Sequence, residues 1–263
     1  MKKRCPKIEL TILGSGTCMP SLKRSSCSFL LDIYGEKLLF DTGAGTIRRL
    51  LEAGVSIEDI GYIFYSHFHP DHTGELVSFL FSSKYSEDCE RKKPLNIIAG
   101  KGFDRFFNGL KSVYGSWIEL AEPVLNIMEL DNKGYDSAEF KEFRVESAPV
   151  DHNEESIAYR IITLPGRKSI VYSGDTDYSE NLISISKNAD LLICESAFPD
   201  ELKTKGHMTP GLAGEIATRA NVRKLVLTHF YPECDKADIF SQCRKTYKGP
   251  LLLAEDLMKI YFD

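Results

Sequence analysis

An α/β fold in a single domain, residues 1–263, is predicted by three properties of the sequence. Short apolar runs typical of buried strands alternate with segments whose apolar residues recur at helical spacing. Of the 263 residues, 43% are hydrophobic, which is enough for a substantial core. No repeat, low-complexity tract or linker-like segment divides the sequence. We therefore expect mixed strands and helices that share one core.

The first third of the chain predicts four strands and two helices. The strands are the apolar runs that end at turns or polar residues, namely 8–13, 26–33, 37–41 and 62–66. Residues 46–54 carry Ile47, Leu50 and Leu51 at helical spacing and end at Gly54, as a helix does. Residues 75–85 form the second predicted helix.

Further strands dominate the rest of the chain. Residues 94–100 predict a strand, and 101–115 a helix with aromatic side chains on one face. Three strands that we expect to form a meander follow at 124–130, 140–150 and 156–164. Three more strands, each followed by polar residues, lie at 169–176, 189–196 and 224–230. A helix is expected over 209–220, with Thr209 as its N-cap and Pro210 in its first turn.

Composition excludes several classes of protein. No run approaches the roughly 20 apolar residues that span a bilayer. The basic N-terminus lacks the apolar core and cleavage site of a signal peptide. Seven scattered cysteines without a CxxC pair are typical of a reducing compartment. We therefore expect a cytoplasmic protein with no membrane partner. Its formal charge of −5 gives no general attraction for nucleic acid.

The segment SHFHPDHTG, residues 66–74, contains three of the six histidines in the chain. His67 and His69 are two residues apart at a strand end, so both side chains point to the same side. Pro70 forces a turn, and Asp71 and His72 then open the next helix. Imidazole and carboxylate groups suit zinc, iron or manganese. The two pairs of ligands therefore predict two metal ions.

HFHPDH resembles the HxHxDH signature of the metallo-β-lactamase-fold hydrolases. The segments LTILGSGTCMPSLKRSSCSFLLDI, KLLFDTGAGT, SGDT, GHMTP and LTHF are most similar to those of the ribonuclease Z group and related phosphodiesterases. The resemblance implies an αββα four-layer sandwich, in which two mixed β-sheets pack face to face with helices outside.

The resemblance also implies roles for individual residues. The first metal would be bound by His67, His69 and His152, and the second by Asp71, His72 and His229. Asp175 in SGDT would bridge the two ions, which are expected to be zinc, with manganese or iron as alternatives. The implied catalytic residues are Asp71, which orients the attacking hydroxide, and the couple of Glu195 and His207, which donates a proton to the leaving oxygen. In the alternative interpretation, His207 only fixes a loop.

We interpret the protein as a dinuclear metal-dependent hydrolase. The leading hypothesis is a phosphodiesterase in which a metal-bridging hydroxide attacks a small or nucleotide-like phosphodiester. A ribonuclease Z-type tRNA 3′-processing endonuclease is one alternative, although only 22 residues separate His152 from Asp175, too few for the long tRNA-binding arm of that group. A lactone, ester or thioester hydrolase on the same centre is another, and a non-catalytic metal- or nucleic-acid-binding protein is a fourth. A homodimer is also considered, with the aromatic segment 106–117 either in its interface or packed on the core.

Two further expectations concern residues outside the ligand set. Residues 41–43 are predicted to support the metal ligands through hydrogen bonds, and residues 14–17 to form a tight turn beside the site. The basic groups at 2–4 and 91–93 are interpreted as solvated surface.

Overall fold

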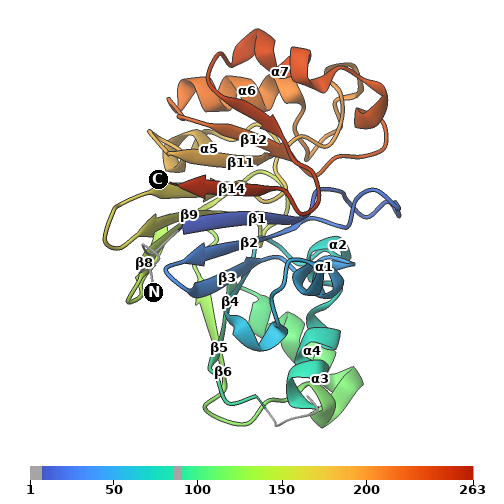
Figure 1. Ribbon diagram of the computed structural model, residues 1–263, viewed down its shortest axis with the longest axis vertical. Helices are drawn as coiled ribbons and strands as arrows, with labels where there is room; N and C mark the ends of the chain where they lie inside the picture. The colour runs from blue at the N-terminus through green and yellow to red at the C-terminus, as the bar shows by residue number, and fades with distance from the viewer. Residues whose placement is uncertain (1–7, 86–90, 263) are drawn as a thin grey trace, which may run out of the picture.

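Two seven-stranded β-sheets form the centre of the computed structural model, which describes residues 8–85 and 91–262. Helices cover the outer face of each sheet (Figure 1), with α6 and α7 over the second sheet and α3 and α4 beside the first. The arrangement is the αββα sandwich expected for the metallo-β-lactamase fold, so the predicted fold class is confirmed.

The first sheet has the strand order β14-β1-β2-β3-β4-β5-β6. Its strands are β1 (Ile8–Gly14), β2 (Ser28–Ile33), β3 (Glu36–Phe40), β4 (Ile60–Tyr65), β5 (Leu95–Gly100), β6 (Leu125–Leu130) and β14 (Lys259–Phe262). The strands from β14 through β1 and β2 to β3 pair in antiparallel fashion, each with the next. From β3 to β6 each strand is parallel to the next. Because β1 pairs with β14, the two ends of the described chain lie side by side (Figure 1).

The second sheet has the strand order β13-β12-β11-β10-β9-β8-β7. Its strands are β7 (Asp136–Glu139), β8 (Phe143–Pro149), β9 (Ile157–Thr163), β10 (Ser169–Tyr172), β11 (Leu191–Glu195), β12 (Leu225–Thr228) and β13 (Leu251–Leu253). Strands β7 to β10 are antiparallel, and β10 to β13 are parallel.

Short helices connect the strands. The α-helices are α1 (Thr46–Glu52), α2 (Pro70–Thr73), α3 (Leu76–Lys84), α4 (Phe103–Tyr114), α5 (Glu180–Ile185), α6 (Pro210–Arg219) and α7 (Ile239–Thr246). The 3-10 turns are η1 (Ile57–Asp59), η2 (Gly115–Ile118), η3 (Asp200–Leu202) and η4 (Cys234–Lys236). The side chain of Thr209 accepts a hydrogen bond from the backbone N–H of Leu212, as predicted for the N-cap of α6.

The core has two parts because side chains alternate along the strands of the first sheet. In β3, Leu38 and Phe40 face the second sheet, whereas Leu39 faces the helices. Phe40 stacks on Phe64 between the sheets, with ring centroids 4.7 Å apart. The other face of the first sheet packs against α1, α3 and α4.

Polar residues gather where strands of both sheets end. Asp41 follows β3 and His67 follows β4, while Asp175 and His229 come after β10 and β12, and Glu195 is the last residue of β11. Since parallel neighbours end at the same edge of a sheet, these residues lie along one edge of the sandwich. The fold therefore gathers the predicted site residues at one place.

Two sequence expectations require correction. The run 124–130 is not part of a meander, because β6 pairs in parallel with β5 in the first sheet, while β8 and β9 belong to the second. Arg91 is not solvated surface: it is 2% exposed, and its guanidinium donates to the carbonyls of Ile57, Ile60 and Lys93. The guanidinium therefore ties the backbone before β5 to the backbone around η1. The basic group at 2–4 lies outside the described residues.

The aromatic segment 106–117 divides between core and surface. Phe107 is buried, whereas Val113, Tyr114 and Trp117 are exposed. The homodimer stays a prediction, as does the assignment of residues 1–263 to a single domain. In the described ranges, no helix has the length and apolar character needed to cross a membrane.

Candidate metal centre

The HxHxDH segment adopts its shape because a proline follows the second histidine. Strand β4 ends at Tyr65, and His67 comes two residues later. His69 is extended, with φ −60° and ψ 150°, as expected of a residue before proline. Pro70 then opens the short helix α2, which carries Asp71 and His72. The segment thus divides into two pairs of side chains, as predicted.

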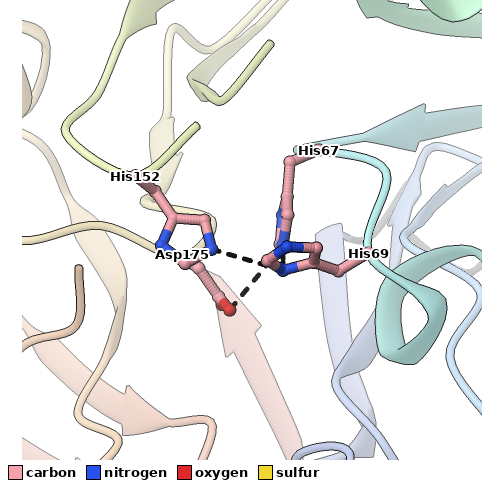
Figure 2. A group of neighbouring side chains, drawn as sticks. All are labelled: His67, His69, His152 and Asp175. Atoms are coloured by element: carbon pink, nitrogen blue, oxygen red, sulfur yellow. Dashed lines mark hydrogen bonds and ion pairs between the residues drawn. The ribbon is translucent and has the colours of Figure 1, made fainter. Parts of the chain in front are cut away.

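The first group consists of His67, His69, His152 and Asp175, shown in Figure 2. The Nδ1 atom of His69 lies 3.1 Å from Nε2 of His67 and 3.3 Å from Nε2 of His152. Asp175 Oδ2 lies 3.8 Å from Nε2 of His67. Ligand nitrogens around a tetrahedral zinc ion, each about 2.0–2.1 Å from it, are about 3.3 Å apart. The spacing of this group therefore fits one ion.

The second group consists of Asp71, His72 and His229, with Asp175 beside it. Nε2 of His229 is 3.6 Å from Asp71 Oδ2 and 3.3 Å from Asp175 Oδ2. Nε2 of His72 is 3.3 Å from Asp175 Oδ1. Asp175 is thus the carboxylate shared by both groups.

Several polar atoms of the predicted ligands are buried without a hydrogen bond. Nε2 of His72, both ring nitrogens of His229 and Oδ1 of Asp175 have no hydrogen-bond partner among the described residues. Buried polar atoms are normally paired, and an unpaired one costs stability. A divalent cation would satisfy Nε2 of His72, Nε2 of His229 and Oδ1 of Asp175, so the residues present fit such an ion.

The electrostatics of the first group favour neutral imidazoles. Burial lowers the pKa of His67 well below its ordinary value, and the neighbouring histidines lower it further. Burial also lowers the pKa of His69. Burial alone would raise the pKa of Asp175, but the charges of His229 and His72 outweigh it, so that pKa lies well below the ordinary value. Neutral imidazole and ionised carboxylate are the forms that bind metals.

Asp41 supports the second group from behind. It is fully buried, and its Oδ2 lies 2.8 Å from Nδ1 of His72. It also accepts hydrogen bonds from the N–H and the hydroxyl of Ser66, both at 2.9 Å, and from the hydroxyl of Tyr172 at 2.7 Å. A metal-ligating histidine is commonly oriented in this way through its other nitrogen. Asp41 thus makes the hydrogen bond to a predicted ligand that was expected of residues 41–43, whereas its role in metal binding stays a prediction.

The buried Glu195 and the partly exposed His207 form a pair next to the predicted metal ligands. Nδ1 of His207 lies 2.9 Å from Oε1 of Glu195 and 3.9 Å from Oδ2 of Asp175. Burial by itself would lower the pKa of His207, but the hydrogen bond and charge of Glu195 outweigh it, so that pKa lies above its ordinary value. Glu195 also accepts from the backbone N–H groups of Thr176 and Met208. Its carboxylate is therefore held in one orientation.

Comparison with known proteins identifies the family. A family profile described as "Anti-Pycsar protein Apyc1" matches residues 8–241, which is 234 of the 263 residues. The chain belongs to this family. It is also similar to ribonuclease Z of Archaeoglobus fulgidus, at 28% identity over 96% of this chain and 97% of that protein, and to ribonuclease Z of Methanosarcina mazei, at 27% identity with the same coverage.

Solved structures resemble this Apyc1-family chain over almost its whole length. Human tRNase Z, short form, has a TM-score of 0.77 and 26% identity, over 96% of this chain and 98% of that chain. The metallo-β-lactamase fold protein YhfI from Bacillus subtilis has a TM-score of 0.83 at 21% identity, over 98% and 100% of the two chains. The Apyc1-family chain is thus a metallo-β-lactamase-fold hydrolase of the ribonuclease Z and phosphodiesterase group.

A cavity of about 580 Å³ in this family member is lined in part by residues that closely follow His67 and His152 in the chain. Phe68, which stands between the first two histidines, forms one wall and stacks on Phe106, with ring planes 18° apart. Arg105 lines the cavity too and makes no hydrogen bond or ion pair within the part of the chain that the structure describes. Glu154 and Glu155 also line the cavity.

Sequence reasoning missed several residues that support the site. The Asn153 amide lies 3.1 Å from Nε2 of His69, and Nδ1 of His152 donates to the carbonyl of Gly206 at 2.8 Å. Ser66 and Tyr172 complete the Asp41 network. Asn153 directly follows a predicted ligand, which could have drawn attention to it. A backbone carbonyl such as that of Gly206 leaves no such signal.

The backbone is strained at functional positions. Asp41 and His229 have φ values of 55° and 60°, which few non-glycine residues adopt. Gly174 in SGDT has φ 59°, and a Cβ atom there would lie 2.7 Å from Cβ of Ser66. Glycine therefore allows the segment after β10 to lie close to the segment after β4, where Asp175 approaches His67.

Proposed function

We propose that the protein is a dinuclear metal-dependent phosphodiesterase that acts on a small, nucleotide-like phosphodiester. The observation that carries the proposal is the position of Asp175 between the two ligand groups, within 3.8 Å of ring nitrogens of His67, His72 and His229. A carboxylate that both ligand groups can share suits two adjacent ions, and zinc suits this mixture of histidine and aspartate.

The site residues divide the chemistry among them. His67, His69 and His152 would hold one ion, Asp71, His72 and His229 the other, and Asp175 both. Such ions supply Lewis acidity and lower the pKa of bound water towards neutrality. Asp71, whose Oδ2 lies 3.6 Å from His229 Nε2, would orient the attacking water through its other oxygen.

His207 is proposed as the proton donor to the leaving oxygen. Its Nδ1 is engaged by Glu195, which leaves Nε2 to face the substrate. Because its pKa is raised, the His207 ring stays protonated up to a higher pH than an ordinary histidine, although burial opposes this effect. A general acid is most effective when its pKa lies near the working pH.

The cavity lined by Phe68 supports the proposal of a nucleotide-like substrate. A flat base could stack on Phe68 or Phe106. Arg105 offers hydrogen-bond donors and Glu155 acceptors, which suit the mixed polar edge of a base.

A second candidate is the activity that gives ribonuclease Z its name. The 27–28% identity to ribonuclease Z over 96% of the chain favours it. Two observations speak against it. Only the short turn 164–168 joins β9 and β10, at the position expected for the long tRNA-binding arm of that group. The chain also carries a net charge of −5. Affinity for tRNA depends on lysine and arginine that neutralise phosphates. A lactone or thioester hydrolase on the same centre is the third candidate.

One experiment tests these functions together. Purified protein loaded with zinc or manganese is assayed on bis-p-nitrophenyl phosphate, cyclic and linear nucleotide diesters, pre-tRNA and a series of lactones. We expect diester hydrolysis that drops at least 100-fold in His207→Ala while the metal content stays at the wild-type level. Activity on lactones alone would show that the proposed phosphodiester substrate is wrong and favour the third candidate. Activity on pre-tRNA alone would favour the second.

A further inference from the structure

The loop of residues 203–208 crosses the edge of the metal centre and contacts both of its functional parts. The backbone carbonyl of Gly206 accepts the hydrogen bond from Nδ1 of His152. The next residue, His207, contacts Glu195. One short loop thus orients a proposed ligand of the first metal and carries the proposed proton donor.

Glycine is required at the centre of this loop. Gly206 has φ 84°, and a Cβ atom there would lie 3.2 Å from Nδ1 of His152. The carbonyl of Gly206 reaches the imidazole only because the backbone adopts this left-handed conformation. Something must hold the loop in it, because glycine has the largest backbone entropy to lose.

Two carboxylates hold the loop, one on each side of Gly206. Downstream, Glu195 accepts from the N–H of Met208 at 3.1 Å and contacts His207. Upstream, Oδ2 of Asp177 accepts from the N–H of Gly206 at 2.9 Å and from Nζ of Lys203 at 2.8 Å. Asp177 therefore holds the N–H of the same residue whose carbonyl accepts from His152.

The backbone of Asp177 is itself anchored next to the site. Its N–H donates to the carbonyl of Asp151 at 2.8 Å, and its carbonyl accepts from the hydroxyl of Thr176 at 2.7 Å. The Asp177 side chain is 27% exposed, so its hydrogen bond to Gly206 is partly shielded from solvent. Its carboxylate therefore has a defined position from which to act on the loop.

We propose that Asp177 is a positioning residue that, through Gly206, orients the metal ligand His152 and the proton donor His207 together. The part that concerns His207 rests on the proposed hydrolysis, whereas the part that concerns His152 needs only metal binding. Interactions of this kind around a ligating histidine typically change metal affinity by about 10–100-fold.

Metal affinity gives the first test. Zinc binding is measured by competition with a chelating indicator for the wild type, Asp177→Ala and Asp177→Asn. We expect the ion at the first site to bind about 10-fold more weakly in Asp177→Ala. Asp177→Asn keeps an oxygen that can accept from the N–H of Gly206, so it should recover most of the affinity.

Asp190→Ala is the matched control. The carboxylate of Asp190 also accepts from a backbone N–H, that of Ser169 at 2.9 Å, and pairs with a cation, Arg223, at 3.2 Å. Its side chain is 19% exposed, close to the value for Asp177, but it lies at the start of β11, at the opposite end of the strand from Glu195. We expect its metal affinity to stay within twofold of wild type. Equal affinity in Asp177→Ala and wild type, or an equal loss in Asp190→Ala, would overturn the proposal.

Hydrolysis gives the second test. On a diester that the wild type cleaves, Asp177→Ala at saturating zinc should lower kcat about 10-fold with little change in KM, because His207 is displaced while the substrate cavity is not. An unchanged kcat under these conditions would refute the His207 part. If the wild type cleaves no ester at all, the proposed function fails, and the zinc titration still decides whether Asp177 positions His152.

Discussion

Replacing Asp41 by alanine should weaken the protein and its second metal site together. Asp41 accepts four hydrogen bonds, from the N–H and hydroxyl of Ser66, from His72 and from the hydroxyl of Tyr172. All of these donors are less than 3% exposed, so water cannot readily replace the lost acceptor. The substitution therefore leaves several buried donors unpaired.

The magnitude follows from these contacts. Each unpaired buried donor costs about 1–3 kcal/mol, and partial entry of water into the space of the missing carboxylate reduces the sum. Removing one partner of a buried charged pair costs about 3–5 kcal/mol, which we take as the expected loss for Asp41→Ala. Asp41→Asn retains one acceptor oxygen and should lose about 1–3 kcal/mol. Zinc should bind about 10–100-fold more weakly at the second site, because His72 loses its orienting partner.

Urea unfolding of the metal-free protein measures the first effect, and zinc competition measures the second. Asp32→Ala is the control, since Asp32 is a partly exposed aspartate of the same sheet that pairs with Lys37 at 2.8 Å. Such surface pairs contribute about 0–1 kcal/mol, and the hydrogen bond that Asp32 accepts from the N–H of Gly35 contributes about 1 kcal/mol, so this variant should lose less stability than Asp41→Ala. A loss below 1 kcal/mol in Asp41→Ala, or unchanged zinc affinity, would refute the role given to Asp41.

Three other predictions follow from the structure. Asp175→Ala should retain at most one ion per chain where wild type retains close to two, as measured by elemental analysis after dialysis; two retained ions would exclude the shared ligand. Arg105→Ala should raise KM severalfold for nucleotide diesters and not for bis-p-nitrophenyl phosphate, whereas Arg144→Ala on the remote strand β8 should change neither. Burial raises the pKa of the Cys243 thiol to about 12 from 9.0. The folded state thus binds this proton more tightly, so its stabilisation is complete below pH 9 and is lost as the pH rises towards 12. Cys243→Ala should accordingly show a shallower decline of unfolding free energy over that range, and an unchanged slope would contradict the assignment.

The local pattern of the chain determined most of the elements and half of the site. Residues 66–72 specify two ligand pairs because a strand end, a proline and a helix start are all local features. The same holds for the N-cap at Thr209. Strand pairing could not be predicted in this way. The run at 124–130 reads as a strand in either sheet, and only the packing of its neighbours places it beside β5.

The tertiary structure alone decided how distant residues meet. His152 reaches His69 across 83 positions of sequence, and Tyr172 reaches Asp41 across 131. Such contacts arise because the strands of two sheets end at one edge of the sandwich, which no local pattern encodes. The burial of Arg91 and the use of a backbone carbonyl at Gly206 to orient His152 are of the same kind. The sequence by itself determined which residues can bind metal and transfer protons, since that depends on side-chain chemistry. Their distances, their partners and the loop that holds two of them in place depend on long-range packing, and only the folded chain decides them.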